Sequence, residues 1–217
     1  MFCGPAFDYQ RARSAELSYL AKQLSIFNFV WGSLETVIKL IDPPKVPKSA
    51  KPGRTSAIDR ALYYLKTNYE PRNPIVFYRD TIAILNDALR VWRPNLAKGA
   101  HIENYISLSG IGLSIVKRIR NSFAHGAAHL PEPGEYSGNP EVATKVIEAS
   151  TRTLLYAIQT LLIAHLNGSS FDITIRENED GELLSENVHF VLRSLHVTEQ
   201  KADEAQLLLF DVRLEEG

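Results

Sequence analysis

The apolar residues of this chain follow two different spacings, and the change between them limits the folds that the chain can adopt. Up to about residue 165 they recur every three to four residues, as on one face of an α-helix. Beyond Gly168 they alternate with polar residues, as in a half-buried β-strand. The sequence therefore predicts a mainly α protein, with a helical domain at residues 1–167 and an acidic, β-rich extension at residues 168–217.

Proline and glycine divide the helical domain into segments. We expect helices at residues 11–41, 55–69, 75–92, 102–125 and 140–165. Four prolines within residues 42–53 exclude a helix there, and Ser56 followed by Asp59 is typical of a helix start. Apolar stripes of this kind on successive helices favour an antiparallel four- to five-helix bundle.

The extension contains three segments with the spacing of a strand, at residues 171–177, 187–197 and 206–214. The sequence NEDGE at 178–182 is typical of a turn, and Val188, Phe190 and Leu192 alternate in the second segment. We expect a small C-terminal antiparallel β meander.

The cysteine content and the N-terminal sequence favour an intracellular protein. The single cysteine, Cys3, excludes an internal disulfide and a multi-cysteine zinc site. The N-terminal residues lack the charged start and apolar core of a signal peptide. The longest apolar run, at residues 153–166, is too short to span a bilayer. We expect a cytoplasmic protein with no membrane partner.

Charge is distributed unevenly along the chain. Residues 1–167 contain 20 Lys and Arg against 13 Asp and Glu, whereas residues 168–217 contain 4 against 12. A basic body beside an acidic tail favours an anionic partner, with the tail as its competitor or modulator. Both regions also fit ordinary solvated surfaces.

The densest group of chemically useful side chains lies in KRIRNSFAHG at residues 117–126. On a helical wheel Asn121 and His125 lie about 40° apart, with Arg118 about 20° from His125. Arg120 lies on the flank, within reach of the same patch. These residues point away from the expected core face, which consists of Leu108, Gly112, Ile115, Val116, Ile119 and Phe123.

Such a group suits the cleavage of RNA without a metal. The reaction needs a base for the 2′-OH proton, an acid for the leaving 5′-oxygen and a cation for the phosphorane. His125 could act as base or acid at neutral pH, and the planar fork of an arginine matches phosphate oxygens. Asn121 could fix the imidazole tautomer or contact the phosphate.

The same segment also fits a purely structural interpretation. His125 followed by Gly126 is typical of a helix C-terminus, where a cation stabilises the dipole and glycine closes the helix. With 14 Arg and 6 His in the chain, roughly one Arg-to-His pair at a comparable spacing is expected by chance.

The sequence RNSFAHG at residues 120–126 resembles the signature of the HEPN superfamily, helical-bundle proteins of which many are metal-independent endoribonucleases. The signature is Arg, a polar residue that is often Asn, three more residues and His, at the end of a bundle helix. Arg120, Asn121 and His125 stand in that order. The sequence FNFVWGSLE at 27–35 resembles the family's early aromatic helix, with Glu35 where many members place a polar residue near the site. The resemblance covers residues 11–167.

The resemblance implies catalysis by His125, Arg120 and Asn121, with Glu35 in support and with Arg118 and Lys117 as RNA-binding residues. It implies a homodimer whose two motifs face each other across a cleft. RNA would be cut to a 2′,3′-cyclic phosphate and a 5′-OH without a cofactor or a metal. The family includes toxins and antiphage defence nucleases, so an antitoxin or regulatory protein is a further expected partner.

Two departures and two alternatives accompany this interpretation. Ala127 stands where the branch paired with a nucleotidyltransferase antitoxin has Tyr, which argues against that branch. Arg118 satisfies a longer gap to His125, but the adjacent Asn121 favours Arg120. The first alternative is a non-catalytic HEPN-like dimer that binds RNA, nucleotide or a partner protein. The second is a helical interaction protein in which the motif is only a capped helix end.

Overall fold

The computed structural model describes residues 4–69, 75–98, 103–124, 140–166, 169, 171–177 and 183–195, and helices account for most of them. The α-helices in this part of the chain are α1 (Gly4–Ile41), α2 (Ala57–Asn68), α3 (Tyr78–Trp92), α4 (Pro94–Lys98), α5 (Ile111–Ala124), α6 (Pro140–His165) and α7 (Val188–Ser194). A 3₁₀ helix, η1 (Leu108–Gly110), precedes α5, and the strands β1 (Asp172–Glu177) and β2 (Leu183–Asn187) form one antiparallel pair. The mainly α class with a small antiparallel sheet is confirmed.

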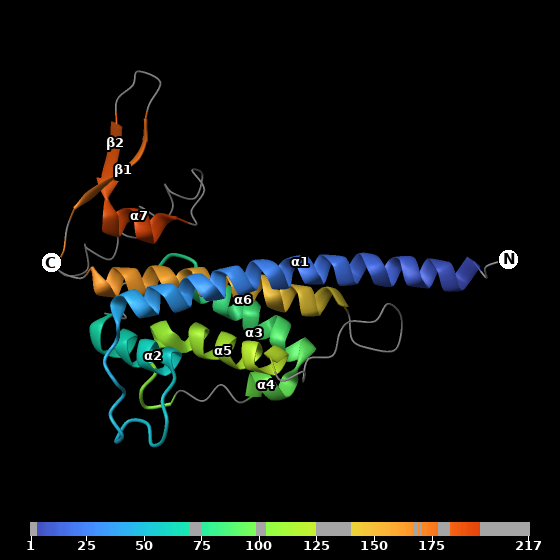
Figure 1. The fold of residues 1–217 in the computed structure, drawn as a ribbon, viewed down its shortest axis with the longest axis horizontal. Helices are drawn as coiled ribbons and strands as arrows, with labels where there is room; N and C mark the ends of the chain where they lie inside the picture. The colour runs from blue at the N-terminus through green and yellow to red at the C-terminus, as the bar shows by residue number, and fades with distance from the viewer. Residues whose placement is uncertain are drawn as a thin grey trace.

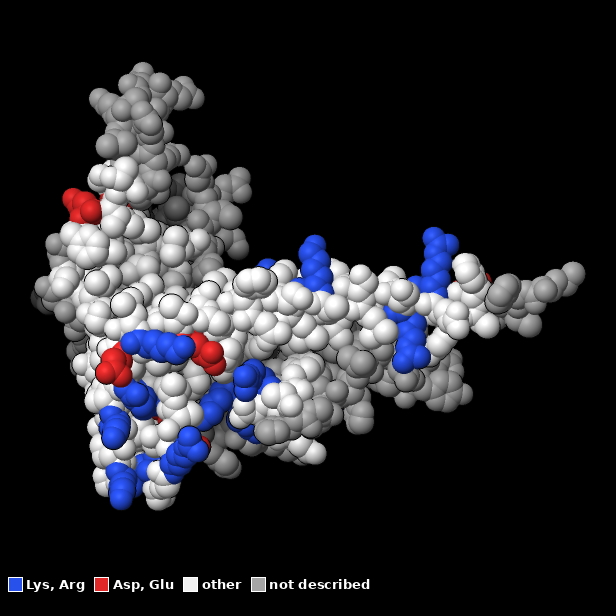
Figure 2. All heavy atoms as spheres, viewed as in Figure 1, with Lys and Arg blue, Asp and Glu red and all other residues white. Residues whose placement is uncertain are grey.

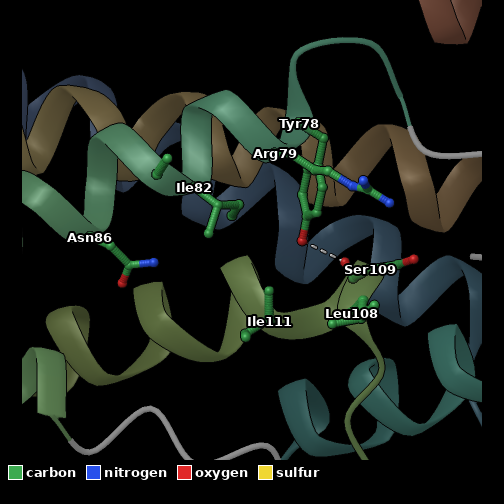
Figure 3. A pocket seen from close by; sticks show the side chains of 8 residues that line it. Tyr78, Arg79, Ile82, Asn86, Leu108, Ser109 and Ile111 are labelled. Carbon is green, nitrogen blue, oxygen red and sulfur yellow. Dashed lines mark hydrogen bonds between the residues drawn. The ribbon is translucent and has the colours of Figure 1, made fainter.

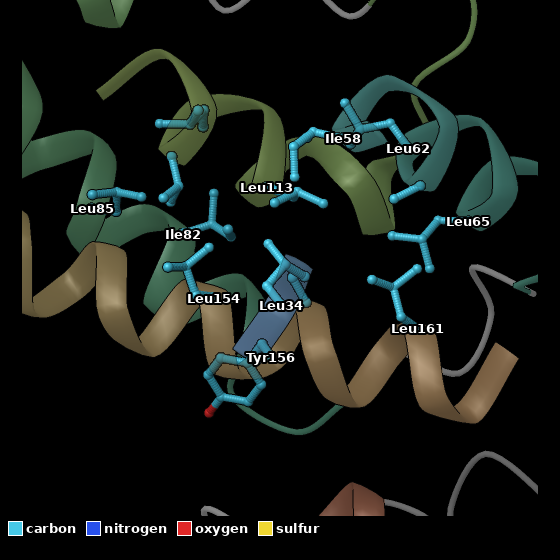
Figure 4. Packing of buried hydrophobic residues seen from close by; sticks show 14 of the residues in the cluster. Leu34, Ile58, Leu62, Leu65, Ile82, Leu85, Leu113, Leu154, Tyr156 and Leu161 are labelled. Carbon is cyan, nitrogen blue, oxygen red and sulfur yellow. The ribbon is translucent and has the colours of Figure 1, made fainter. Parts of the chain in front are cut away.

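Helix α6 is the central element of the helical body. It packs against α1 and α3 along much of its length, and also against α2 and α5 (Figure 1). The core between these helices contains at least one fully buried leucine from each, namely Leu34 of α1, Leu62 of α2, Leu85 of α3, Leu113 of α5 and Leu154 of α6 (Figure 4). One continuous apolar core thus joins the five longest helices.

The start of α2 confirms the helix-start signature at Ser56. The Ser56 hydroxyl accepts a hydrogen bond from the backbone N–H of Asp59, and the Asp59 carboxylate accepts one from the backbone N–H of Ser56 at 2.8 Å. Each side chain therefore satisfies an N–H group that the helix itself leaves unpaired. Residues 42–56, which connect α1 to α2, contain no helix, as the prolines require.

Helix α1 begins at Gly4, earlier than the expected residue 11, and its N-terminal end extends past the rest of the body (Figure 1). Ala6–Ile41 is long and apolar enough to cross a membrane by length and composition, a test that core helices and signal sequences also pass. The C-terminal half belongs to the core, since Phe27, Trp31, Leu34 and Ile38 are all buried there. Packing inside the body thus accounts for these four residues, whereas Phe29 and Leu40 in the same half are 81% and 72% exposed.

The expected helix at 102–125 is shorter in the structure. Residues 103–107 are not helical, and α5 begins only at Ile111 after the single turn of η1. The reason is that two consecutive residues of this segment, Tyr105 and Ile106, are both buried against the body, which an irregular backbone allows. Residue Leu108, expected on the core face, is 62% exposed, so that part of the expectation is wrong. The short helix α4 was not expected, although Pro94 is well suited to a first helical position.

The extension differs from the expected meander in its second segment. Residues 188–194, expected as a strand, form α7. Asn187 caps this helix by accepting a hydrogen bond from the N–H of His189 at 3.0 Å. Val188 is buried and Leu192, one helical turn later, packs against the core, while Phe190 is 39% exposed. The expected third strand at 206–214 lies outside the described residues.

Candidate functional site at the end of helix α5

Helix α5 presents the predicted motif because its opposite face is anchored in the core. Leu113, Val116 and Ile119 are completely buried, at spacings of three residues that keep them on one side of the helix. Phe123 extends this face in the last turn, where its ring stacks on Trp92 with centroids 5.4 Å apart. Arg120 and Asn121 lie outside this buried face and are exposed.

Arg120 is exposed and lies over a buried aromatic ring of another helix. Its guanidinium carbon is 5.4 Å from the ring centroid of Trp31 in α1, a distance at which the cation is attracted to the ring face. The Trp31 indole N–H donates a hydrogen bond of 2.7 Å to a carboxylate oxygen of Glu35. Trp31 thus brings together two residues that the sequence assigned to one site, Arg120 and Glu35, and it was itself not predicted as a site residue.

Asn121 is exposed beside Arg120, one turn before the position of His125. Its side chain has no hydrogen bond within the part of the chain that the structure describes. His125 itself lies outside the described residues, as does Gly126. Arg120 and Asn121 are therefore two neighbouring polar side chains, both accessible to a ligand.

Arg118 occupies a less open position than the helical wheel indicated, and Lys117 is held in an ion pair. Arg118 is half-buried, and its Nη1 is enclosed with no hydrogen-bond partner among the described residues. The Lys117 ammonium lies 2.7 Å from the Asp59 carboxylate in α2, with its side chain 23% exposed. Lys117 therefore joins α5 to α2 in this structure, and its role in RNA binding stays a prediction.

Asp59 is the centre of a charged cluster that the sequence did not reveal. Its Oδ1 accepts hydrogen bonds from the ammonium groups of Lys51 and Lys117, both at 2.7 Å, and from the Tyr105 hydroxyl at 3.0 Å. Its Oδ2 accepts from the N–H and the hydroxyl of Ser56, both at 2.8 Å. The carboxylate is almost fully buried. Its donors come from the α1–α2 connection, from α5, from the segment before η1 and from the start of α2 itself.

The cluster shifts the pKa values of Asp59, Lys51 and Tyr105. Burial alone would raise the pKa of Asp59, but the hydrogen bonds from Lys117, Lys51 and Ser56 hold it well below its usual range. Burial would lower the pKa of Lys51, but its hydrogen bonds to Asp59 and Tyr105 raise it. Burial and the charge of Asp59 raise the pKa of Tyr105 to about 12, against the opposing effect of Lys51. The cluster thus sets two lysine side chains against one carboxylate.

A cavity of about 340 Å³ lies elsewhere, between α3 and the start of α5 (Figure 3). Its walls are mainly apolar, including Ile82 and Ile111, with Arg79 and Asn86 two helical turns apart on α3. The buried Tyr78 hydroxyl donates to the carbonyl of Ser109 at 2.7 Å and fixes this end of η1 to α3. No predicted site residue lines the cavity, so it is separate from the motif.

Within the described residues no group of three or more His, Cys, Asp or Glu side chains is placed to hold a metal ion. Neither a protein-family model nor a curated protein nor a solved structure matches the chain.

Proposed function

We propose that the chain is a metal-independent endoribonuclease of the HEPN type, with a four- to five-helix bundle as its catalytic body. The order of Arg120, Asn121 and His125 in the sequence supports this proposal. In its cellular context, the enzyme serves in antiphage defence or as a toxin that a partner protein controls.

The position of Arg120 is the observation that carries the proposal. The guanidinium is exposed to solvent, yet it is oriented by the buried Trp31 ring, which Glu35 in turn fixes through the indole N–H. An oriented cation stabilises developing charge on a phosphate at little cost of reorganisation. A helix end that served only as a cap would not need this arrangement.

The proposed reaction uses each side chain of the motif. The 2′-oxygen forms a bond to phosphorus as His125 accepts the 2′-OH proton, and the bond from phosphorus to the 5′-oxygen breaks as that oxygen is protonated. Arg120 neutralises the extra charge of the phosphorane, and Asn121 orients the imidazole or the phosphate. A homodimer supplies two copies of His125 to one cleft, one as base and one as acid.

The proposal is tested by replacing the oriented cation. We expect Arg120→Gln to lower the single-turnover rate of RNA cleavage in excess EDTA by roughly 10²- to 10³-fold, the usual effect of removing one such charge-stabilising donor. Arg79→Gln is the matched control, because Arg79 is also exposed on a helix but lines the separate cavity. A DNA strand of the same sequence should not be cut, since it has no 2′-OH.

Cleavage that requires an added metal, or equal cleavage of the DNA strand, would contradict the proposed chemistry. RNA binding without cleavage by the wild type would instead favour the non-catalytic dimer. Loss of activity in both arginine variants would show that overall charge, rather than the position of Arg120, determines the rate.

A further inference from the structure

The connection between α1 and α2, residues 42–56, is a fixed part of the structure. Lys51 is attached to Asp59 and Tyr105. At the other end, the Arg60 guanidinium donates to the carbonyl of Pro43 at 2.6 Å and pairs with Asp42 at 2.6 Å. Val46 between these points is buried in the core. Anchors at the start, middle and end hold this connection against the body.

The connection also carries an uncompensated positive charge. It contains four basic residues and one acidic residue. The acidic residue, Asp42, already pairs with Arg60 from α2. Lys45, Lys48 and Arg54 are exposed and have no ion pair within the described residues. The charges of these three side chains are therefore available to a ligand.

The charged connection adjoins the motif helix through the Asp59 cluster. Asp59 binds Lys51 of the connection and Lys117 of α5 through the same oxygen. Lys117 lies three residues before Arg120, which places the two side chains on neighbouring positions of one helix flank. Figure 2 shows Lys and Arg gathered on this face, over the α1–α2 connection and the elements next to it.

We propose that the α1–α2 connection and the adjoining flank of α5 form a preorganised cationic surface that binds the phosphate backbone of RNA and leads it to Arg120. The proposal rests on the proposed function for the identity of the polyanion. Lys45, Lys48 and Arg54 contact successive phosphates without reading sequence, because phosphate contacts carry no base information. The anchors at Asp59 and Pro43 hold the backbone of the connection in place before RNA arrives, which reduces the ordering cost of binding.

The test compares two triple variants with the same change in net charge, both made in the full-length His125→Ala protein so that RNA is bound but not cut. One replaces Lys45, Lys48 and Arg54 by Gln. The other replaces Arg11, Lys22 and Arg79 by Gln; these residues are also exposed but lie on the N-terminal half of α1 and on α3. Fluorescence anisotropy with two single-stranded RNAs of unrelated sequence gives the affinity at 50–200 mM KCl, and thermal unfolding checks that both variants are folded.

We expect the connection variant to bind both RNAs at least about tenfold more weakly at moderate salt. The slope of log affinity against log salt should fall by about 2, the release expected from three lost contacts to a single strand. The control variant should change affinity by less than about twofold, since its charges lie outside the proposed cationic surface.

Equal weakening by the two variants would overturn the inference, because net charge alone would then explain binding. Unchanged affinity in the connection variant would also overturn it, while RNA cleavage by the wild type in the same preparation would leave the proposed function standing. Failure of the His125→Ala parent to bind RNA at all would overturn the inference, and the absence of cleavage by the wild type would then overturn the proposed function as well.

Discussion

At the scale of single residues, Asp59 connects three segments that are distant in the sequence. It completes the capping box of α2, holds Lys51 of the α1–α2 connection and holds Lys117 of α5. Its side chain is 3% exposed, so the surrounding hydrogen bonds replace the water that it has lost. The positions of the basic connection and of the motif helix both depend on this carboxylate.

We expect Asp59→Asn to lower the free energy of unfolding at neutral pH by roughly 1.5–3 kcal/mol, the range for hydrogen bonds to a charged group. Because folding depresses the pKa of Asp59, its stabilisation is complete above the unfolded pKa of about 4 and is lost as the pH falls toward the folded value. The difference between wild type and variant should therefore shrink from about pH 5 downwards. Urea denaturation at a series of pH values measures it, and a difference independent of pH would contradict this role.

At the scale of elements, the contact of α5 with α3 and α6 depends on the absence of a side chain at Gly112. A Cβ there would overlap Ile82 Cδ1 of α3 and lie 2.7 Å from Thr153 Cγ2 of α6. The Gly112 N–H also donates to the Tyr78 hydroxyl at 3.2 Å. The start of the motif helix is thus fitted closely between its two neighbours.

We expect Gly112→Ala to destabilise the protein by about 1–3 kcal/mol, as overpacking of a closely packed core does. Gly32→Ala is the matched control, because a Cβ at Gly32 in α1 meets nothing within 4 Å. That variant should be neutral or up to about 1 kcal/mol more stable through helix propensity. Thermal or urea unfolding of both variants measures the effect, and equal stability of the two would show that α5 can shift without cost.

Elements set by local interactions could be predicted from the sequence. The capping box at Ser56 and the prolines after Ile41 act within a few residues, and both predictions are confirmed. Helix α7 was missed because alternation of Val188, Phe190 and Leu192 fits a strand, whereas the Asn187 cap and the burial of Val188 favour a helix.

The arrangement of the candidate site could be predicted only in part. The motif on α5 and Glu35 follow from sequence patterns, but the contact of Arg120 with Trp31 depends on how two helices pack. The hydrogen bond between Lys117 and Asp59 joins residues 58 positions apart. Such contacts depend on the tertiary fold, which no local pattern encodes.

At the scale of the whole molecule, the basic body and the acidic extension are in contact. Helix α7 packs against α6, and Leu192 lies against the core. The β1–β2 pair stands beyond the body at the end where α6 finishes (Figure 1). The extension is therefore attached through apolar contacts, and activity is best measured on the full-length chain.

The most direct test of the account is single-turnover cleavage of end-labelled RNA, in excess EDTA, by the full-length wild type and by His125→Ala. We predict cleavage by the wild type alone, with fragments that end in a 2′,3′-cyclic phosphate and a 5′-OH. Equal cleavage by the folded His125→Ala variant, or fragments with 5′-phosphate ends, would contradict the assignment of the active site to the end of α5.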